Sequence, residues 1–306
     1  GKRKYENIQV LNYTHLKYAP LFISLLTFIL VVSYIIHNEA SQKEDNIIEE
    51  LPAPGYEMPI GFTEYRNAIS LELPDTLYFA GERVPLEIAD VRERLDRELH
   101  INTYWHSSTI FLLKRGNQWL PRIENILKEN NIPDDFKYIA AIEGGFKNDV
   151  SPKNAVGFWQ ILKSAGKENG LEINKDVDER YDPLKSTVAA CKYLRKAYAK
   201  FGNWTNVAAS YNRGMAGFNR ALENQQVESY YDLLLNEETS RYIFRLLAIK
   251  EIFENPDKFG FDISNEHLYE AEKLSYVEVN EDIKDLVLFA KDQGINYKLL
   301  KRHNPW

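Results

Sequence analysis

The chain has 306 residues, of which 44% are hydrophobic and 27% charged, an ordinary composition for a globular protein of one large domain or two modest ones. Its formal net charge of -7 argues against nucleic acid as the main partner. The single cysteine, Cys191, cannot form an intramolecular disulfide and falls on the apolar face of an expected helix. Neither it nor the six scattered histidines form a cluster with metal-ligand spacing, so we expect no metal and no cofactor.

An apolar run from Tyr18 to Ile36 is long enough for one membrane-spanning helix. Basic residues precede this run and an acidic stretch, 37–50, follows it, so the positive-inside rule keeps residues 1–17 in the cytoplasm and places the remainder outside. A cleaved signal peptide is the alternative. Its cleavage site would fall in the segment 37–40, His-Asn-Glu-Ala, which is a poor match, and a retained single-pass anchor is therefore favoured.

Residues 37–82 are expected to form an extended linker and lead-in. The segment is acidic at first and then carries prolines at intervals that forbid a long helix: Pro52, Pro54, Pro59 and Pro74. Such a segment could hold the folded part some distance above the membrane.

From Pro85 onward the apolar residues recur at helical spacing. The pattern predicts helices over 88–101, over 107–116 and from Pro121 to about residue 130, with a further helix following Pro133. We expect Pro121 to begin a new helix because proline suits a first helical position.

The pattern from Asp182 to about residue 254 also predicts helices. Asp182-Pro183 is a strong helix start and Gly202 a stop, and two more helices are expected over 204–222, interrupted at Gly214 and Gly217, and over 239–254. No alternating strand pattern of any length occurs between residues 85 and 255, so the fold class is mainly α.

One stretch, 138–146, places an acidic residue at the end of an apolar helical run. Gly144 and Gly145 follow Glu143 and predict the helix stop, so Glu143 should lie in the last turn. Apolar neighbours and the negative end of the helix dipole would both raise the pKa of Glu143, and a carboxyl group kept protonated near neutral pH can act as a general acid. A solvated glutamate at a helix end is the alternative.

Five motifs follow one another in a fixed order. They are Glu143-x-x-Phe146, Gly157-Phe158-Trp159-Gln160, the segment 178–183 (Asp-Glu-Arg-Tyr-Asp-Pro), the segment 210–214 (Ser-Tyr-Asn-Arg-Gly) and the segment 238–242 (Glu-Thr-Ser-Arg-Tyr). Over roughly residues 80–262 the chain resembles the soluble lytic transglycosylase (goose-type lysozyme-like) family, most closely its membrane-bound lytic murein transglycosylases of the D type. The resemblance implies a lysozyme-like helical domain, taken here as 83–262, that lies in the periplasm and is anchored to the inner membrane.

The same resemblance implies the chemistry. The substrate would be peptidoglycan glycan strands, cut between N-acetylmuramic acid and N-acetylglucosamine, and Glu143 would act first as acid and then as base. The muramoyl 6-hydroxyl would attack C1 and leave a 1,6-anhydro end without water. Most glycosidases use two carboxylates, but no second acidic residue sits in a matching motif, and we expect Asp176, Asp178 and Asp182 only to cap helices and order loops.

The other site residues also come from the resemblance. Gln160 and the backbone around Gly157 would line the floor near the cleaved bond. Tyr211 and Asn212 match a motif whose asparagine holds the N-acetyl sugar, and Tyr242 matches a tyrosine whose hydroxyl points at the acid. Amide, hydroxyl and aromatic groups suit sugar binding. Packing is the alternative for both tyrosines. Phe158 and Trp159 could equally be core residues or a platform for sugar rings.

Gly144 and the incomplete C-terminal segment keep other functions open, whereas Ser210 is a small change. Most members have serine after the catalytic glutamate, where this chain has Gly144, and Ser210 replaces the usual alanine. A catalytically weak or silent peptidoglycan-binding subunit of an envelope assembly is therefore the alternative function. A hydrolase that uses water would need a second carboxylate base.

The segment 263–306 has a short alternating start, Val277 and Val279, followed by two apolar groups separated by Gly294. It resembles the front of a LysM sugar-binding module, in which two helices pack on a two-stranded sheet. We expect either a small, incomplete α/β LysM-like unit or a helical hairpin docked on the body.

Overall fold

The computed structural model describes residues 69–306. The predicted membrane-spanning run 18–36, its cytoplasmic flank 1–17 and most of the linker lie outside the described residues. No helix within 69–306 combines the length and the apolar character that a membrane crossing requires. The described residues form one compact unit that begins at Ile69.

A two-residue hairpin opens this unit. Strands β1 (Tyr78–Phe79) and β2 (Glu82–Arg83) pair antiparallel, with Tyr78 opposite Arg83. The Glu82 carboxylate accepts hydrogen bonds from the backbone amides of Trp204 (2.5 Å) and Thr205 (2.9 Å), the first two residues of helix α7. Carboxylates are stabilising at a helix N-terminus, so the hairpin ties the start of the unit to its middle.

Two long helices follow, α2 (Ala89–Tyr104) and α3 (His106–Glu129). The prediction that α3 would be two helices separated before Pro121 is wrong, since Pro121 lies inside one continuous helix. The buried residues of α3 keep helical spacing on both sides of the proline: Leu112, Leu113, Gly116, Ile123 and Leu127. Burial of this stripe outweighs the cost of a proline inside a helix, about 3 kcal/mol.

A 3-10 turn, η2 (Asp134–Phe136), leads into the short helix α4 (Lys137–Gly144), which carries Glu143. The predicted stop after Glu143 is confirmed. Gly145 supplies it alone, with φ 56° and ψ 31° in the left-handed region, whereas Gly144 is still helical.

Helix α5 (Lys163–Glu168) and the turn η3 (Glu179–Tyr181) precede α6 (Pro183–Phe201). The Asp182 side chain caps α6 by accepting from the amides of Leu184 (2.9 Å) and Lys185 (3.0 Å), and Gly202 ends the helix at φ 71°. The predicted bounds of α6 and the capping role of Asp182 are thus confirmed.

The stretch 204–225 forms two helices, α7 (Trp204–Arg213) and α8 (Met215–Gln225), followed by the turn η4 (Tyr230–Asp232). The break falls at Gly214, at φ 77° and ψ 140°, as predicted. Gly217 does not interrupt the helix, because it lies inside α8 with helical neighbours on both sides.

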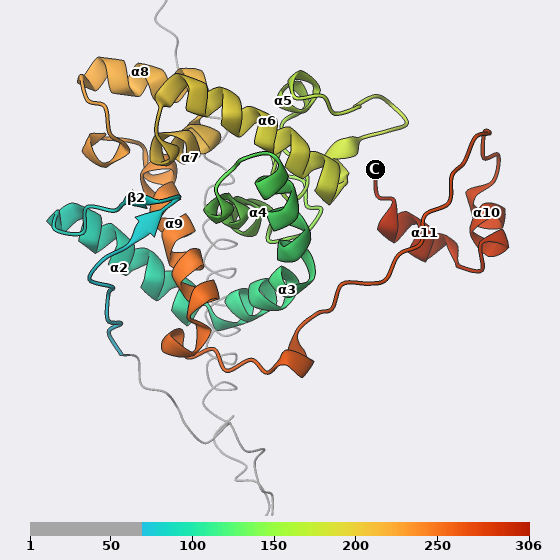
Figure 1. The fold of residues 1–306 in the computed structure, drawn as a ribbon, viewed down its shortest axis with the longest axis horizontal. Helices are drawn as coiled ribbons and strands as arrows, with labels where there is room; N and C mark the ends of the chain where they lie inside the picture. The colour runs from blue at the N-terminus through green and yellow to red at the C-terminus, as the bar shows by residue number, and fades with distance from the viewer. Residues whose placement is uncertain (1–68) are drawn as a thin grey trace, which may run out of the picture. The chain divides into compact units, whose positions relative to one another are not determined.

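Helix α9 (Glu237–Glu254) is the centre of the body, and it packs against α2, α4 and α7 (Figure 1). Its buried residues are distributed around the helix rather than along one stripe. A helix that is apolar on most sides belongs in the middle of a domain, and α9 is therefore the element on which the segments carrying the site are assembled.

The segment after α9 has the turns η5 (Pro256–Phe259) and η6 (Asn265–His267) and the short helices α10 (Leu286–Asp292) and α11 (Tyr297–His303). The expected strand around Val277 and Val279 does not form, and both side chains are exposed. A strand needs a ladder partner, and residues 263–306 include none. The α/β prediction for this segment is therefore correct only for its helices.

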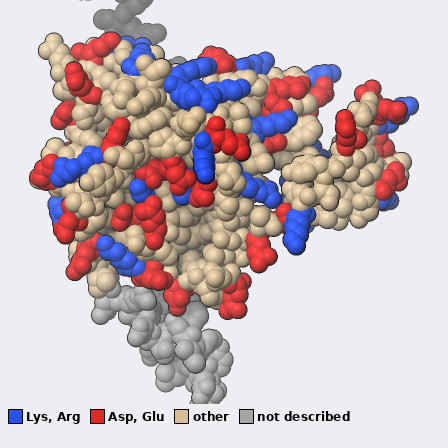
Figure 2. All heavy atoms as spheres, in the orientation of Figure 1, with Lys and Arg blue, Asp and Glu red and all other residues tan. Residues whose placement is uncertain are grey.

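Within residues 69–306 the hairpin is the only ladder beyond isolated bridges, and the mainly helical prediction is confirmed. Basic and acidic side chains are interspersed over the face drawn in Figure 2.

Candidate active site

A groove of about 530 Å³ opens beside the end of α4. Four of the residues predicted from the sequence line it: Glu143, Gln160, Tyr211 and Asn212. The remaining wall comes from the loop after α4, from the two ends of α5, from α6, from the turn between α7 and α8 and from the start of α9, with Ser151, Lys153, Leu162, Asn169, Tyr193, Arg213 and Glu238 among its residues. We call this cavity the groove.

Two arginines from different helices hold the end of α4. Arg245 of α9 donates to the Ile142 carbonyl (2.9 Å), and Arg115 of α3 donates to the Gly145 carbonyl (2.7 Å). The carbonyls at a helix C-terminus have no partner within the helix, and cations are stabilising there. The two guanidinium groups thereby fix the turn that presents Glu143.

The pKa of the Glu143 carboxyl is raised, because most of it is enclosed and burial disfavours the charged form. Its neighbours act in both directions. The Tyr242 hydroxyl and the Arg245 charge lower the pKa of Glu143, and the negative charge of Glu238 raises it. The carboxyl can therefore stay protonated at a pH above the ordinary glutamate range. The carboxylate that remains after proton donation is stabilised by Tyr242 and Arg245.

The backbone next to Glu143, at Gly144, packs closely against the backbone of Gly157 and Phe158. A Cβ built on Gly144 would lie 2.7 Å from the Gly157 carbonyl oxygen, and equally close to the Cα and carbonyl oxygen of Phe158. A Cβ on Gly157, which has φ 80°, would lie 2.3 Å from the Arg180 carbonyl oxygen. Only glycine allows these three segments to stack this closely. Gly144, which departs from the family's serine, is thus a packing requirement of this chain.

Gln160 lies in the same loop, at φ 45°. Its amide nitrogen donates to the carbonyls of Asp149 and Gly157, each at 3.0 Å. Both bonds use the nitrogen, so among the described residues the Gln160 amide oxygen has no partner and can accept a hydrogen bond in the groove.

The side chain of Asn212 is held in one orientation. Its nitrogen donates to Glu238 Oε1 (3.2 Å) and its oxygen accepts from the Thr239 hydroxyl (2.8 Å). Tyr211, the preceding residue, lines the groove and donates its hydroxyl to the Trp159 carbonyl (2.7 Å). Burial and the charge of Glu143 raise the pKa of Tyr211, so its hydroxyl stays protonated.

Tyr242 is fully buried on α9 and does not line the groove. Its hydroxyl interacts with the Glu143 carboxyl, although no partner meets ordinary hydrogen-bond geometry. Burial first, and then the nearby Glu143 charge, raise the pKa of Tyr242. A neutral phenol directed at Glu143 can stabilise the carboxylate form by donating to it.

The packing favours the core interpretation of Phe158 and Trp159 over a sugar platform. Phe158 is 3% exposed and Trp159 is 0% exposed, and neither lines the groove. The Trp159 indole nitrogen donates to the Thr187 hydroxyl (2.8 Å), so its polar atom is satisfied inside the protein. The Phe158 ring packs edge-on against Trp119.

Glu238 is a groove residue that sequence reasoning did not single out. It precedes Tyr242 by four residues on α9, and side chains four apart share one helix face. Since Tyr242 was expected to face Glu143, this spacing could have placed Glu238 in the groove as well.

Asp178 does not reach the groove. It binds the Arg180 guanidinium (2.7 Å) and caps the turn η3, which confirms the loop-ordering role expected for it. Within 69–306 no group of three or more His, Cys, Asp or Glu side chains could hold a metal ion. The groove thus offers one enclosed carboxyl together with amide and phenol groups.

Comparisons with known proteins agree with this arrangement. Residues 122–234 match the family described as "Transglycosylase SLT domain", and residues 275–306 match "Soluble lytic transglycosylase C-terminal LysM-like domain". The chain is 26% identical over 239 residues to "Membrane-bound lytic murein transglycosylase D" of Escherichia coli strain K12, and equally to the protein of that name from strain CFT073. Each alignment covers 75% of this chain and 51% of the relative.

A "Putative tributyltin chloride resistance protein" of Alteromonas sp. strain M-1 is 29% identical over 112 residues, which is 36% of this chain and 54% of that protein. The chain thus spans about half the length of the curated relatives it matches. The resemblance inferred from the five motifs is confirmed, and the chain carries a transglycosylase SLT domain followed by a soluble lytic transglycosylase LysM-like domain.

Proposed function

We propose that this chain is a peptidoglycan lytic transglycosylase that cleaves the β-1,4 bond between N-acetylmuramic acid and N-acetylglucosamine and leaves 1,6-anhydro ends. The observation that carries the proposal is the Glu143 carboxyl, whose pKa burial raises, at the wall of a groove lined by amide and aromatic side chains. The SLT domain and the similarity to a lytic murein transglycosylase support it.

In the first step Glu143 gives its proton to the glycosidic oxygen, and the bond between that oxygen and C1 of the muramoyl ring breaks. The substrate's own N-acetyl carbonyl shares the positive charge that develops at C1. Glu143 is now a carboxylate, and the Arg245 charge and the Tyr242 hydroxyl, which lower its pKa, stabilise that form.

In the second step the Glu143 carboxylate takes the proton of the muramoyl 6-hydroxyl, and the oxygen of that hydroxyl bonds to C1. The ring closes as the 1,6-anhydro sugar, and Glu143 is protonated again for the next cycle. Burial raises the pKa of Glu143 and so favours the acid that donates in the first step, whereas the Tyr242 hydroxyl and the Arg245 charge stabilise the carboxylate that accepts in the second.

The remaining groove residues would bind the glycan. The Asn212 amide, fixed by Glu238 and Thr239, would hold the N-acetyl group of a sugar, and the free amide oxygen of Gln160 would accept from a sugar hydroxyl. The Tyr211 ring would cover an apolar sugar face. Because Asn212 and Gln160 are already oriented, little conformational entropy is lost when the strand binds.

A hydrolase that uses water is a second candidate, favoured by one observation. Glu238 places a second carboxylate in the groove, the kind of group that could activate a water molecule. Glu238, however, already accepts a hydrogen bond from Asn212, which suits a role in orienting that amide. The two candidates differ in product, since hydrolysis leaves reducing ends.

The test is mass spectrometry of muropeptides released from purified sacculi by the native chain, by Glu143→Gln and by Glu238→Gln. We expect the native chain to release anhydro ends, Glu143→Gln to release none while its circular dichroism is unchanged, and Glu238→Gln to keep the anhydro product at a lower rate. Undiminished release by Glu143→Gln would refute the assignment of the acid.

The other outcomes separate the alternatives. Reducing ends that disappear in Glu238→Gln would establish the hydrolase. Binding of sacculi without any cleavage by the native chain would establish the alternative function, a glycan-binding subunit.

The domain plan and location belong to the same proposal. Residues 18–36 would anchor the chain in the inner membrane, with 1–17 in the cytoplasm, 37–82 as linker, 83–262 as catalytic domain and 263–306 as a LysM-like tail in the periplasm. The membrane-bound relative and the LysM-like match support this plan. Alkaline carbonate extraction of membranes tests it: we expect the full chain to stay in the pellet and a chain lacking residues 1–68 to be released.

A further inference from the structure

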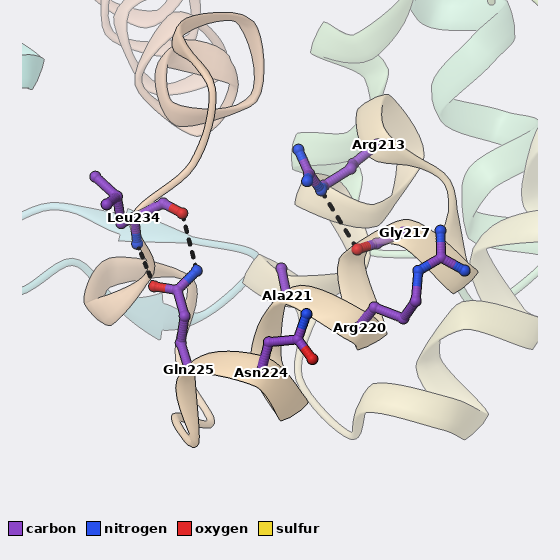
Figure 3. A pocket seen from close by; sticks show the side chains of 7 residues that line it. All are labelled: Arg213, Gly217, Arg220, Ala221, Asn224, Gln225 and Leu234. Carbon is purple, nitrogen blue, oxygen red and sulfur yellow. Dashed lines mark hydrogen bonds between the residues drawn. The ribbon is translucent and has the colours of Figure 1, made fainter. Parts of the chain in front are cut away.

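A second cavity, of about 480 Å³, lies between helix α8 and the segment that follows η4. We call it the α8 pocket, and it is lined by Arg213, Gly217, Arg220, Ala221, Asn224, Gln225 and Leu234. Figure 3 shows Arg213, Gly217 and Arg220 next to one another. The lining has two guanidinium groups and no carboxylate.

The wall of the α8 pocket is held in place by the protein itself. The Gln225 side chain donates to the Leu234 carbonyl (2.9 Å) and accepts from the Leu234 amide (2.8 Å), which fastens the segment after η4 to α8 (Figure 3). Arg213 donates to Asn236 Oδ1 (2.6 Å) and to the Gly217 carbonyl (3.3 Å). These bonds hold the pocket wall and the Arg213 side chain in place without a bound ligand.

Two polar side chains in this pocket are not used by the fold. Among the described residues Arg220 and Asn224 make no side-chain hydrogen bond or ion pair, and Arg213 bonds only to uncharged oxygens. The chain has 45 acidic residues against 38 basic ones, so carboxylates to neutralise an arginine are plentiful. Two arginines in one cavity without a carboxylate partner form a site of positive charge suited to an anion.

Arg213 connects the α8 pocket to the groove, because it lines both cavities. It directly follows Asn212, whose amide is expected to hold a sugar. The two cavities therefore share a lining residue that adjoins a sugar-binding candidate.

We propose that the α8 pocket binds a carboxylate of the peptide stem that a muramic acid residue carries, through Arg220 and Arg213 with Asn224 as a further donor. This inference rests on the proposed function, since it takes a peptidoglycan strand as the occupant of the groove. The sugar backbone of the strand offers hydroxyl and amide groups, whereas the stem supplies carboxylates, and a guanidinium group binds a carboxylate with two parallel hydrogen bonds.

The test compares two synthetic glycan strands that differ only in the stem, with free carboxylates in one and the same carboxylates amidated in the other. Binding to the full chain carrying Glu143→Gln is measured by calorimetry, and cleavage by the chain with Glu143 is measured by anhydro-product release. In each background Arg220 is replaced by Gln. Arg92→Gln is the matched control, because Arg92 is an exposed arginine on α2, outside both cavities, that makes no side-chain bond among the described residues.

We expect Arg220→Gln to weaken binding of the acid strand by about tenfold, as for the loss of one charge-assisted hydrogen bond, and to raise its KM by a similar factor. The amidated strand should bind Arg220→Gln and the unsubstituted chain equally, and Arg92→Gln should change neither strand. Equal binding of the acid strand by Arg220→Gln and its parent, or equal losses on both strands, would overturn the proposal.

The binding measurement separates this inference from the proposed function. If the native chain cleaves both strands but Arg220→Gln does not distinguish them, only the pocket assignment fails. If no strand is cleaved while the acid strand still loses affinity in Arg220→Gln, the pocket assignment stands and the proposed catalytic function fails.

Discussion

Replacing Gly144 by serine, the residue that most members of the family have at this position, should destabilise this chain and slow it. The new Cβ would lie 2.7 Å from three backbone atoms, the Gly157 oxygen and the Cα and oxygen of Phe158. Backbone cannot rotate out of the way as a side chain can. The loop also has little room to shift, because a Cβ on Gly157 would itself collide with the Arg180 carbonyl oxygen.

Overpacking of a core typically costs about 1–3 kcal/mol, and the absence of a flexible neighbour puts this site at the upper end, about 3 kcal/mol. For a unit of this size each kcal/mol shifts Tm by about 2–4 °C, so Gly144→Ser should lower Tm by roughly 6–12 °C. The rate of anhydro-product release should also fall, because the displaced backbone adjoins Glu143.

Thermal unfolding followed by circular dichroism measures this effect, with Gly217→Ala as the control. A Cβ on Gly217 would only touch Arg213 Cγ at 3.5 Å, an ordinary contact, and alanine is favoured over glycine inside a helix by about 1 kcal/mol. The two substitutions should therefore shift Tm in opposite directions. A Gly144→Ser variant that unfolds at or above the Tm of the native chain would show that the backbone stack is not tight.

Three further predictions concern charges in the body. Glu143→Gln should raise the free energy of unfolding, and the difference from the native chain should grow above pH 4.5 by about 1.4 kcal/mol per pH unit up to the folded pKa. The reason is that over this range the folded native chain keeps a proton that the unfolded chain has lost. Urea unfolding at pH 4 and pH 7 measures this, and a difference that does not change with pH would contradict it. Arg241→Met should lower the free energy of unfolding by about 3 kcal/mol. It removes the partner of the Glu98 carboxylate, which is 1% exposed and accepts from Arg241 at 2.6 Å. Adding Glu98→Leu should restore most of that free energy in the same urea assay, and no recovery would refute this cause. Asp182→Ala should lower the free energy of unfolding by about 1 kcal/mol because α6 loses its cap, whereas Asp182→Asn should lower it much less. Equal losses in the two variants would show that the side-chain oxygen does not act as a cap.

The sequence located helix ends best where a local signal and the core agree. Asp182-Pro183 begins α6 and Gly202 ends it, because the cap, the proline and the left-handed residue all act within one turn. Pro121 misled because its effect is local, whereas the buried stripe of α3 extends over both of its sides. Gly217 misled because a single glycine costs a helix only about 1 kcal/mol, and the burial of Phe218 and Ala221 holds α8 together around it.

The site residues also fall into those that the sequence motifs located and those that only the packing placed. Glu143, Gln160 and Asn212 were named from motifs and meet in one groove, although their roles in the reaction stay predictions. Phe158 and Trp159 belong to the same motif as Gln160 but turn into the core, and only three-dimensional packing separates the neighbours in such a run.

The helix that carries Glu143 has eight residues, and the two arginines that hold its end come from α3 and α9. An isolated helix of that length is not stable in water. The acid therefore has no preorganised local scaffold and is presented only when three separate parts of the chain have come together. On the proposed function, a nascent or partly unfolded copy would be harmless to the cell wall, and a lytic activity would be switched on by completion of folding itself.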